Sequence, residues 1–332
     1  MRIRQNRRTP KIVALLAAGL VLAAVTAATR APASSNRAAA IVLKELCATA
    51  GTFQPLPTTD PGLSIPIWGF GEPTSPGDCT TATASLPGPV ISVNEGDVVT
   101  LMITNALPGT RTISIEAPGI TFNPGPTEAA SGATVSLTFT AGAPGTYLYQ
   151  SSGDAERQTA MGLYGALIVR SNTAGRAYDD VSTAYDSEAP LVLSAVDPAF
   201  NADPDNFNMH DYLATYWLIN GTSYPDTAPI SAPAGSRLLL RYLNAGFDNT
   251  TMMVLGMHER VLARDANLLN NPFDADAETI PAGATEDAIA TIPAAGAGPN
   301  GFALYNRQLH VTNGTPPNSS YTPGGMMTFI QP

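Results

Sequence analysis

The chain has 332 residues, of which 17 are basic and 27 are acidic, and its formal net charge is −10 at neutral pH. Six of the basic residues precede residue 31, so the remainder is strongly acidic and lacks the basic surface that binds nucleic acid. Glycine and proline, 29 residues each, separate short runs of Val, Ile, Leu, Thr and Tyr, a pattern typical of all-β sandwiches.

The first 40 residues have the features of an export signal followed by a short linker. A basic stretch up to Lys11 precedes an apolar run over residues 12–28, and small residues continue to Ala40. The run is shorter than the roughly 20 residues that cross a bilayer, so we expect cleavage between Ala27 and Ala40, with an uncleaved anchor as the alternative. The Arg7-Arg8 pair is compatible with twin-arginine export, although an ordinary basic region also explains it. We therefore expect a periplasmic or secreted protein.

The chain has two cysteines, Cys47 and Cys79. In an oxidising compartment such a pair is expected to form a disulfide. The alternative is that one of them is the thiolate ligand of a blue-copper site, which needs two histidines close by. No histidine precedes His210, so the sequence favours the disulfide.

After the leader, the chain contains two blocks with the same order of parts. Residues 88–105 and 230–244 each predict a strand, a tight turn and an alternating strand that ends in asparagine. Gly96 and Gly235 stand at the turns, where a positive φ is favourable. Each block leads to a closing pair of strands. We predict two tandem β-sandwiches, over residues 41–175 and 176–332, with the boundary in the polar stretch 170–185.

The segment from Gly145 to Arg170, GTYLYQSSGDAERQTAMGLYGALIVR, carries the clearest family resemblance. Shorter matching pieces are LPGP at 86–89, EGD at 95–97, YWLING at 216–221 and RYLNAG at 241–246. Together these pieces resemble the bacterial two-domain cupredoxin proteins of the multicopper oxidase group. The resemblance implies an all-β fold of two tandem cupredoxin-like Greek-key β-sandwiches. It also implies copper as the cofactor of active members and a homotrimer as the assembly.

The same resemblance shows where this chain departs from the active members. They carry His-x-His in the segment that corresponds to residues 112–119, which contains no histidine here. They carry a second His-x-His where this chain has Gln150 and Ser152, and a final His-Cys-His run where it has His310 without a cysteine. A type 1 copper site needs about two histidines and one cysteine, and this chain has three histidines in all. The sequence therefore predicts lost copper ligands and no resident cofactor.

Met252, Met253, Met257 and His258 form the remaining candidate metal site, because thioether and imidazole ligands suit Cu(I). The alternative is that the methionines are core residues of a strand. On a strand, Met253 and Met257 share one face and Met252 takes the other, so the four side chains meet only if the strand bends at Gly256. Geometry favours core packing, and copper at this site is kept as the alternative.

Other polar residues are weaker candidates. His210 could bind a cation with Asp205 or Asp211, but a solvated loop histidine explains it better. Alternation places His310 on an outward polar face together with Gln308. The acidic run of Asp179, Asp180, Asp186 and Glu188 is compatible with a weak Ca²⁺ site or with a solvated linker.

Two main hypotheses follow from the sequence. The first is a secreted, non-catalytic structural or binding module of the cell envelope, with an unknown protein or envelope partner and no catalytic residues. The second is a copper-binding protein or copper-dependent oxidoreductase of the multicopper oxidase family that uses the Met/His site. A different enzyme hosted on the same fold is the least supported, because no catalytic constellation is visible.

Overall fold

A computed structural model describes residues 37–314 and 323–332. The predicted export signal therefore lies outside the described residues, except for its last positions, residues 37–40. Within the described parts of the chain, no helix is long and apolar enough to cross a membrane.

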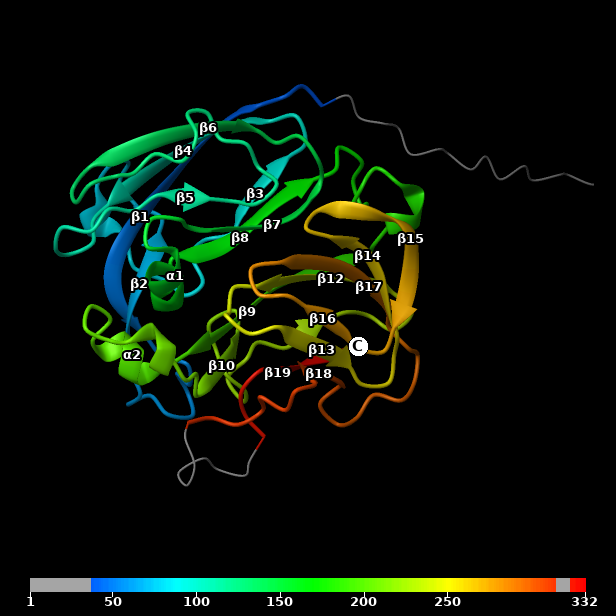
Figure 1. The fold of residues 1–332 in the computed structure, drawn as a ribbon. Coiled ribbons are helices and arrows are strands. Elements are labelled where there is room, and N and C mark those ends of the chain that lie inside the picture. Colours follow the sequence, from blue (N-terminus) through cyan, green and yellow to red (C-terminus); the bar gives the residue numbers. More distant parts are fainter. Residues whose placement is uncertain (1–36, 315–322) are drawn as a thin grey trace, which may run out of the picture. The chain divides into compact units, whose positions relative to one another are not determined.

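The first half of the described chain forms two four-stranded sheets (Figure 1). The first sheet has the order β2 (Ile65–Gly71), β1 (Ile41–Phe53), β4 (Val98–Asn105) and β6 (Thr134–Thr140). The second has the order β3 (Ile91–Asn94), β8 (Tyr164–Arg170), β7 (Gly145–Ser151) and β5 (Ile115–Glu116). Two short helices lie between strands, η1 (Cys79–Thr81) and α1 (Ala155–Met161). We call this pair of sheets sandwich 1.

The second half forms a six-stranded and a five-stranded sheet, which we call sandwich 2. The larger sheet has the order β10 (Tyr216–Ile219), β9 (Ser187–Val196), β12 (Arg237–Asn244), β17 (Thr285–Thr291), β14 (Glu259–Arg264) and β15 (Asn267–Ala275). The smaller has the order β11 (Ile230–Ser231), β19 (Met327–Gln331), β18 (Phe302–Asn306), β13 (Thr250–Val254) and β16 (Glu278–Ile280). The short helices here are η2 (Val181–Thr183), α2 (Pro198–Ala202) and η3 (Met209–Asp211).

These sheets confirm the predicted all-β fold. In β4, Val99, Leu101 and Ile103 alternate with more exposed residues and enter the core of sandwich 1, as their spacing predicts. Gly96 and Gly235 both have positive φ, at 85° and 80°, which is the conformation that the two predicted turns require. The predicted boundary stretch lies between β8, the last strand of sandwich 1, and β9, the first strand of sandwich 2.

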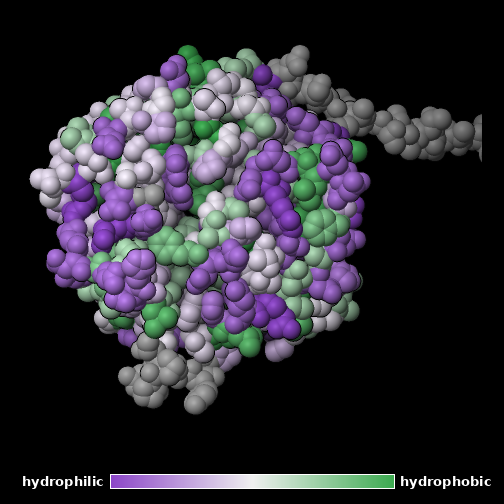
Figure 2. All heavy atoms as spheres, in the orientation of Figure 1, coloured by the Kyte–Doolittle hydropathy of each residue, from purple (hydrophilic) through white to green (hydrophobic). Residues whose placement is uncertain are grey.

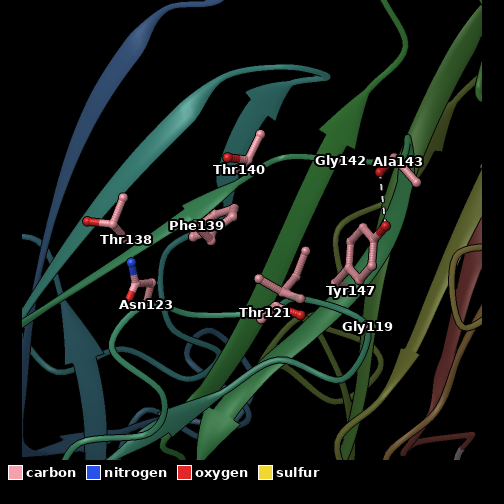
Figure 3. A pocket seen from close by; sticks show the side chains of 10 residues that line it. Gly119, Thr121, Asn123, Thr138, Phe139, Thr140, Gly142, Ala143 and Tyr147 are labelled. Atoms are coloured by element: carbon pink, nitrogen blue, oxygen red, sulfur yellow. Dashed lines mark hydrogen bonds between the residues drawn. The ribbon is translucent and has the colours of Figure 1, made fainter.

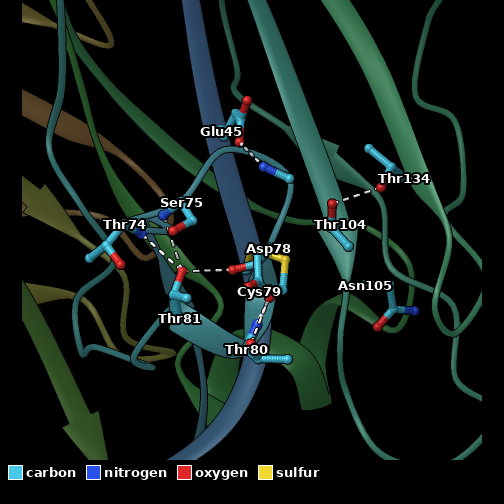
Figure 4. The surroundings of a disulfide bond; sticks show 12 residues. Glu45, Thr74, Ser75, Asp78, Cys79, Thr80, Thr81, Thr104, Asn105 and Thr134 are labelled. Carbon is cyan, nitrogen blue, oxygen red and sulfur yellow. Dashed lines mark hydrogen bonds between the residues drawn. A yellow bond between two sulfur atoms is a disulfide. The ribbon is translucent and has the colours of Figure 1, made fainter.

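The predicted disulfide is confirmed. Cys47 on β1 is bonded to Cys79 at the start of η1, with 5.6 Å between their Cα atoms (Figure 4). β1 lies between β2, with which it pairs antiparallel, and β4, with which it pairs parallel. The bond therefore ties the first strand of the sandwich to the loop that follows β2, and it leaves neither cysteine as a thiolate.

Sandwiches 1 and 2 share buried surface. One apolar cluster combines Leu148 and Tyr164 of sandwich 1 with Val192, Leu218 and Leu243 of sandwich 2. A second link is Phe200 on α2, which lies between strands of sandwich 2 in the sequence but packs into the core of sandwich 1. Burial of apolar surface from both halves stabilises the pair as one structure.

Candidate functional site

The two segments expected to carry copper ligands in sandwich 1 lie side by side. The short strand β5 pairs with the end of β7, so that Glu116 stands opposite Gln150 and Ile115 opposite Ser151. The Gln150 amide Nε2 donates to a Glu116 carboxylate oxygen at 2.9 Å. The structure thus brings together the two segments that the resemblance matches to histidine motifs, and an amide–carboxylate hydrogen bond joins them.

Further hydrogen bonds connect the end of β7 to helix α1 and to the residues just before β5. The buried Ser151 hydroxyl donates to the Ser114 carbonyl oxygen at 3.0 Å and also to the Gln158 side-chain oxygen. The Gln158 Nε2 donates to the Thr112 carbonyl oxygen at 2.8 Å, and the Ser152 backbone N–H donates to the Ser114 carbonyl oxygen at 3.1 Å. Gln158 lies on α1, and no sequence pattern indicated its contact with β7.

The donor set of this region does not fit copper of the oxidase type. Its side chains offer a carboxylate, two amides and serine hydroxyls, which would bind a metal ion through oxygen. Blue-copper and related sites are built from imidazole and thiolate. Since both cysteines form the disulfide, the thiolate is missing as well. Gln150 and Ser152 therefore do not supply the ligands of a copper site of this type.

The Met/His candidates fall in three different surroundings. Met252 on β13 is buried in the core of sandwich 2, with 1% of its surface exposed. Met253 faces the other side of the strand, where the Tyr305 hydroxyl lies 3.6 Å from its sulfur. Met257 and His258 follow in the turn before β14 and line one hollow of about 380 Å³. Met257 and His258 therefore line one hollow, which Met252 and Met253 do not line. Met257 also packs against the core cluster that contains Met252.

His258 has a carboxylate partner that the sequence did not indicate. Its Nδ1 lies 2.7 Å from an Asp276 carboxylate oxygen, and both side chains are more than 70% exposed, at 72% and 73%. Asp276 comes just after β15, the strand that pairs with β14, so only the hairpin brings the two residues together. A carboxylate on one ring nitrogen leaves the other, Nε2, available as a ligand.

His310 does not lie on an outward polar face, so that prediction was wrong. Its ring stacks on Trp217, with 4.5 Å between centroids and an angle of 16° between the planes. β18 ends at Asn306, and Leu309 has a φ of 65°, so residues 307–310 form a turn to which strand alternation does not apply. Desolvation in this half-buried position lowers the pKa of His310.

The acidic candidates are used in structural contacts. Near His210, the Asp205 carboxylate accepts from Arg111 Nη2 at 2.5 Å, and Asp211 accepts from Asn208 at 3.0 Å. In the acidic run, Asp180 caps η2 and Asp179 accepts from Ser171. Asp186 accepts from the Arg237 backbone N–H, and Glu188 pairs with Arg241.

Across residues 37–314 and 323–332, no three His, Cys, Asp or Glu side chains lie close enough together to hold a metal ion.

Comparison with known proteins agrees with the resemblance seen in the sequence. The family model of multicopper oxidases matches residues 72–174, which cover most of sandwich 1. Among curated proteins, Laccase-25 of Oryza sativa subsp. japonica is 24% identical over 240 residues. That match covers 65% of this chain and 40% of the laccase, so the chain spans less than half of its relative.

Solved structures of copper proteins share the fold of almost the whole described chain. The blue copper oxidase of Nitrosomonas europaea superposes with a TM-score of 0.73 and 22% identity over 88% of this chain and 86% of that one. The multicopper oxidase mgLAC gives 0.71 and 21%, over 88% and 87% of the two chains. The copper nitrite reductase of Nitrosomonas europaea gives 0.68 and 20%, over 88% and 93%. The described chain therefore has a two-domain cupredoxin-like fold, and its residues 72–174 match the multicopper oxidase family.

Proposed function

We propose that this protein has lost the copper ligands of its relatives and acts as a non-catalytic structural or binding module of the bacterial envelope. The observation that carries the proposal is the Glu116–Gln150 hydrogen bond. It occupies the place where two strand segments of an active relative would each present imidazoles. The overall fold of the copper-protein relatives is retained, while histidines of the active members are replaced here by groups that bond to one another.

The remaining histidines support the same proposal. His210 lies in η3, His258 in the turn before β14, and His310 against Trp217. Each has a different local environment, and the sequence contains no fourth histidine. A type 1 site needs two imidazoles and a thiolate in one place, and a trinuclear cluster needs more imidazoles than the chain contains.

The location and the partners also belong to the proposal. The basic and apolar leader in residues 1–40 supports export to the periplasm or the medium. On the face drawn in Figure 2, hydrophilic and hydrophobic side chains are interspersed, so this face offers no broad apolar surface. An acidic exported module would recognise an envelope protein or another envelope component, and the resemblance suggests a homotrimer, which light scattering would test.

Copper loading tests the proposal directly. The mature protein would be incubated with Cu(II), dialysed and examined by elemental analysis and by visible and near-ultraviolet absorption. We expect clearly less than one copper per chain and no blue or near-ultraviolet charge-transfer band, with an active multicopper oxidase as positive control. One tightly held copper per chain together with such a band would refute the proposal.

One observation favours a second candidate, Cu(I) binding at Met257 and His258. Both residues line the same hollow, and Asp276 holds Nδ1 of the imidazole so that Nε2 is free. The double variant Met257→Leu/His258→Ala should then lose Cu(I) or Ag(I) binding, as measured by competition with a chromogenic chelator. His210→Ala, which removes another exposed histidine, should bind like the parent. Equal affinity in the double variant and the parent would reject this candidate.

A further inference from the structure

A hollow of about 440 Å³ opens in sandwich 1 (Figure 3), and neither Gln150 nor Ser152 lines it. Its wall is formed by the segment 119–123, which follows β5, by the end of β6, and by the connection to β7. Phe139 and Tyr147 contribute buried aromatic rings. Its volume lies within the range of small-molecule pockets.

The hollow is lined by uncharged groups, although the chain is strongly acidic. Thr121, Asn123 and Thr140 contribute two hydroxyls and an amide, and these side chains make no hydrogen bond to any other part of the described chain. Among the described residues that line the hollow, none carries an ionised side chain. Burial raises the pKa of the Tyr147 phenol, which therefore stays neutral as well.

The shape of the hollow is held by specific contacts. The Tyr147 hydroxyl donates to the Ala143 carbonyl oxygen at 2.9 Å, which fixes the ring against the β6–β7 connection (Figure 3). Gly119 has a φ of 90°, and a Cβ there would come within 3.0 Å of the Tyr147 ring, so the glycine lets the segment lie on the ring. The site is therefore formed before any ligand arrives.

We infer that this hollow binds a neutral saccharide. A sugar ring carries hydroxyls around its rim, which can bond to Thr121, Asn123 and Thr140. Its faces carry C–H groups, which can pack on the half-buried Ile120 of the lining. A hydrocarbon would bury these polar groups without partners, at a cost in affinity. An anionic ligand would find no cation in the lining and would be repelled by the acidic protein. The inference rests on the proposed function, because it gives the binding module a class of ligand, an uncharged glycan.

Saturation-transfer NMR and calorimetry with a panel of saccharides test the inference. The panel contains glucose, N-acetylglucosamine, their β-linked disaccharides, and the glucuronate analogue as the charged counterpart. We expect binding of at least one neutral sugar with a dissociation constant of about 1 mM or lower, and at least about tenfold weaker binding of the uronate. Binding of the soluble disaccharide alone points to a free sugar. Cosedimentation with insoluble cell-wall polysaccharide, blocked by the disaccharide, points to an envelope glycan.

Two variants place the binding in this hollow. At Gly142 an added Cβ would meet only the Thr140 carbonyl oxygen, at 4.0 Å, so Gly142→Trp should fill the hollow without disturbing the fold. Thr121→Val/Thr140→Val removes the hydroxyls and keeps the shape. Both should weaken binding at least about tenfold. Ser136→Ala, an exposed position on the same strand β6, is the matched control and should bind like the parent.

Absence of binding to every neutral sugar of the panel would overturn the inference, and so would binding that both variants leave unchanged. Neither result would affect the proposed loss of copper ligands, which copper loading decides separately. Conversely, a copper-loaded protein that also binds sugars would refute the non-catalytic proposal and leave the saccharide site standing.

Discussion

Glu286 on β17 is a carboxylate held in the interior of sandwich 2. Only 2% of the residue is exposed, one carboxylate oxygen accepts from Arg264 Nε at 3.1 Å, and the other has no partner in the described structure. Burial, helped by the nearby Glu278 and opposed by Arg264, raises the pKa of Glu286 from its ordinary 4.5 to about 8. In the folded protein the ionised form of this side chain is therefore disfavoured near neutral pH.

This environment makes stability depend on pH in a definite direction. Because the folded-state pKa is raised, the contribution of Glu286 to the free energy of unfolding is greatest below about pH 4.5 and falls until about pH 8. Glu286→Gln should remove most of this fall, so that at pH 8.5 it is more stable than the parent by about 2–4 kcal/mol. Urea unfolding of the parent and of Glu286→Gln between pH 5 and 8.5 measures the free energy of unfolding of each protein.

Glu259, whose pKa burial raises to about 7, should leave a smaller residual slope in the Glu286→Gln variant. The exposed Glu156→Gln is the control and should follow the parent at every pH. Identical pH slopes in the parent and in Glu286→Gln would show that the buried carboxylate is not the titrating group.

The turn of the β14–β15 hairpin packs closely against the start of β7. Its two turn residues, Asp265 and Ala266, have φ values of 48° and 58°, as a two-residue hairpin turn of type I′ requires. Ala266 is an unusual choice, because this conformation strains a residue with a side chain. The turn seats on Gly145 at the start of β7, where an added Cβ would lie 2.5 Å from the Ala266 Cβ.

Substitutions at these two positions should therefore be coupled. Gly145→Ala should lower the free energy of unfolding by about 2–4 kcal/mol, since it creates this overlap and Gly145 also has a φ of 152°. Ala266→Gly should change it by about 0–1 kcal/mol in the stabilising direction, because glycine adopts this φ without strain.

Denaturant unfolding of the double variant measures the coupling. In Gly145→Ala/Ala266→Gly the Cβ overlap is absent, so the loss should be at least about 1 kcal/mol smaller than the sum of the two single effects. Strictly additive effects would mean that the hairpin moves away from Gly145 without cost.

At the scale of the whole molecule, a buried ion pair between β12 and β17 of sandwich 2 anchors a contact with sandwich 1. Arg241 and Asp287 are each 1% exposed, and Arg241 Nη1 lies 3.2 Å from an Asp287 oxygen. The Thr146 hydroxyl of sandwich 1 donates to Asp287 at 2.6 Å and accepts from Arg241 at 2.9 Å, and Arg241 Nε reaches Glu188 at 2.9 Å. Breaking such a pair leaves a buried charge without compensation.

Removal of the arginine should destabilise the whole molecule. Arg241→Met is expected to lower the free energy of unfolding by about 3–5 kcal/mol, and Arg241→Met/Asp287→Asn by less, because the uncompensated carboxylate is then gone. Arg260→Met, which breaks the exposed pair with Asp274, should cost less than about 1 kcal/mol. Thermal or urea unfolding gives all three values, and a small effect of Arg241→Met would mean that water reaches the junction.

The sequence predicted the strand alternation of β4 and the two glycine turns, because both depend on residues that are neighbours in the chain. It predicted the disulfide because the chain has only two cysteines. The family resemblance matched residues 112–119 and 149–152 each to a histidine motif, but it did not predict the contact between them. The sequence did not predict Asp276 beside His258 or Gln158 beneath Ser151, because hairpin register and a short helix create these contacts between residues that no sequence period connects. Whether Met257 and His258 bind metal stays a prediction.

Each sandwich repeats the same strand–turn–strand block, yet the two no longer have separate interiors. A single apolar cluster contains Leu148 and Tyr164 of sandwich 1 and Leu243 of sandwich 2. Phe200, which comes from the second half of the chain, packs into the core of sandwich 1. A descendant gene that inherited only one of the two blocks would encode a protein with an exposed apolar wall. Recombination can thus pass these halves on only as a pair, and later substitutions in either half had to leave the shared apolar cluster intact.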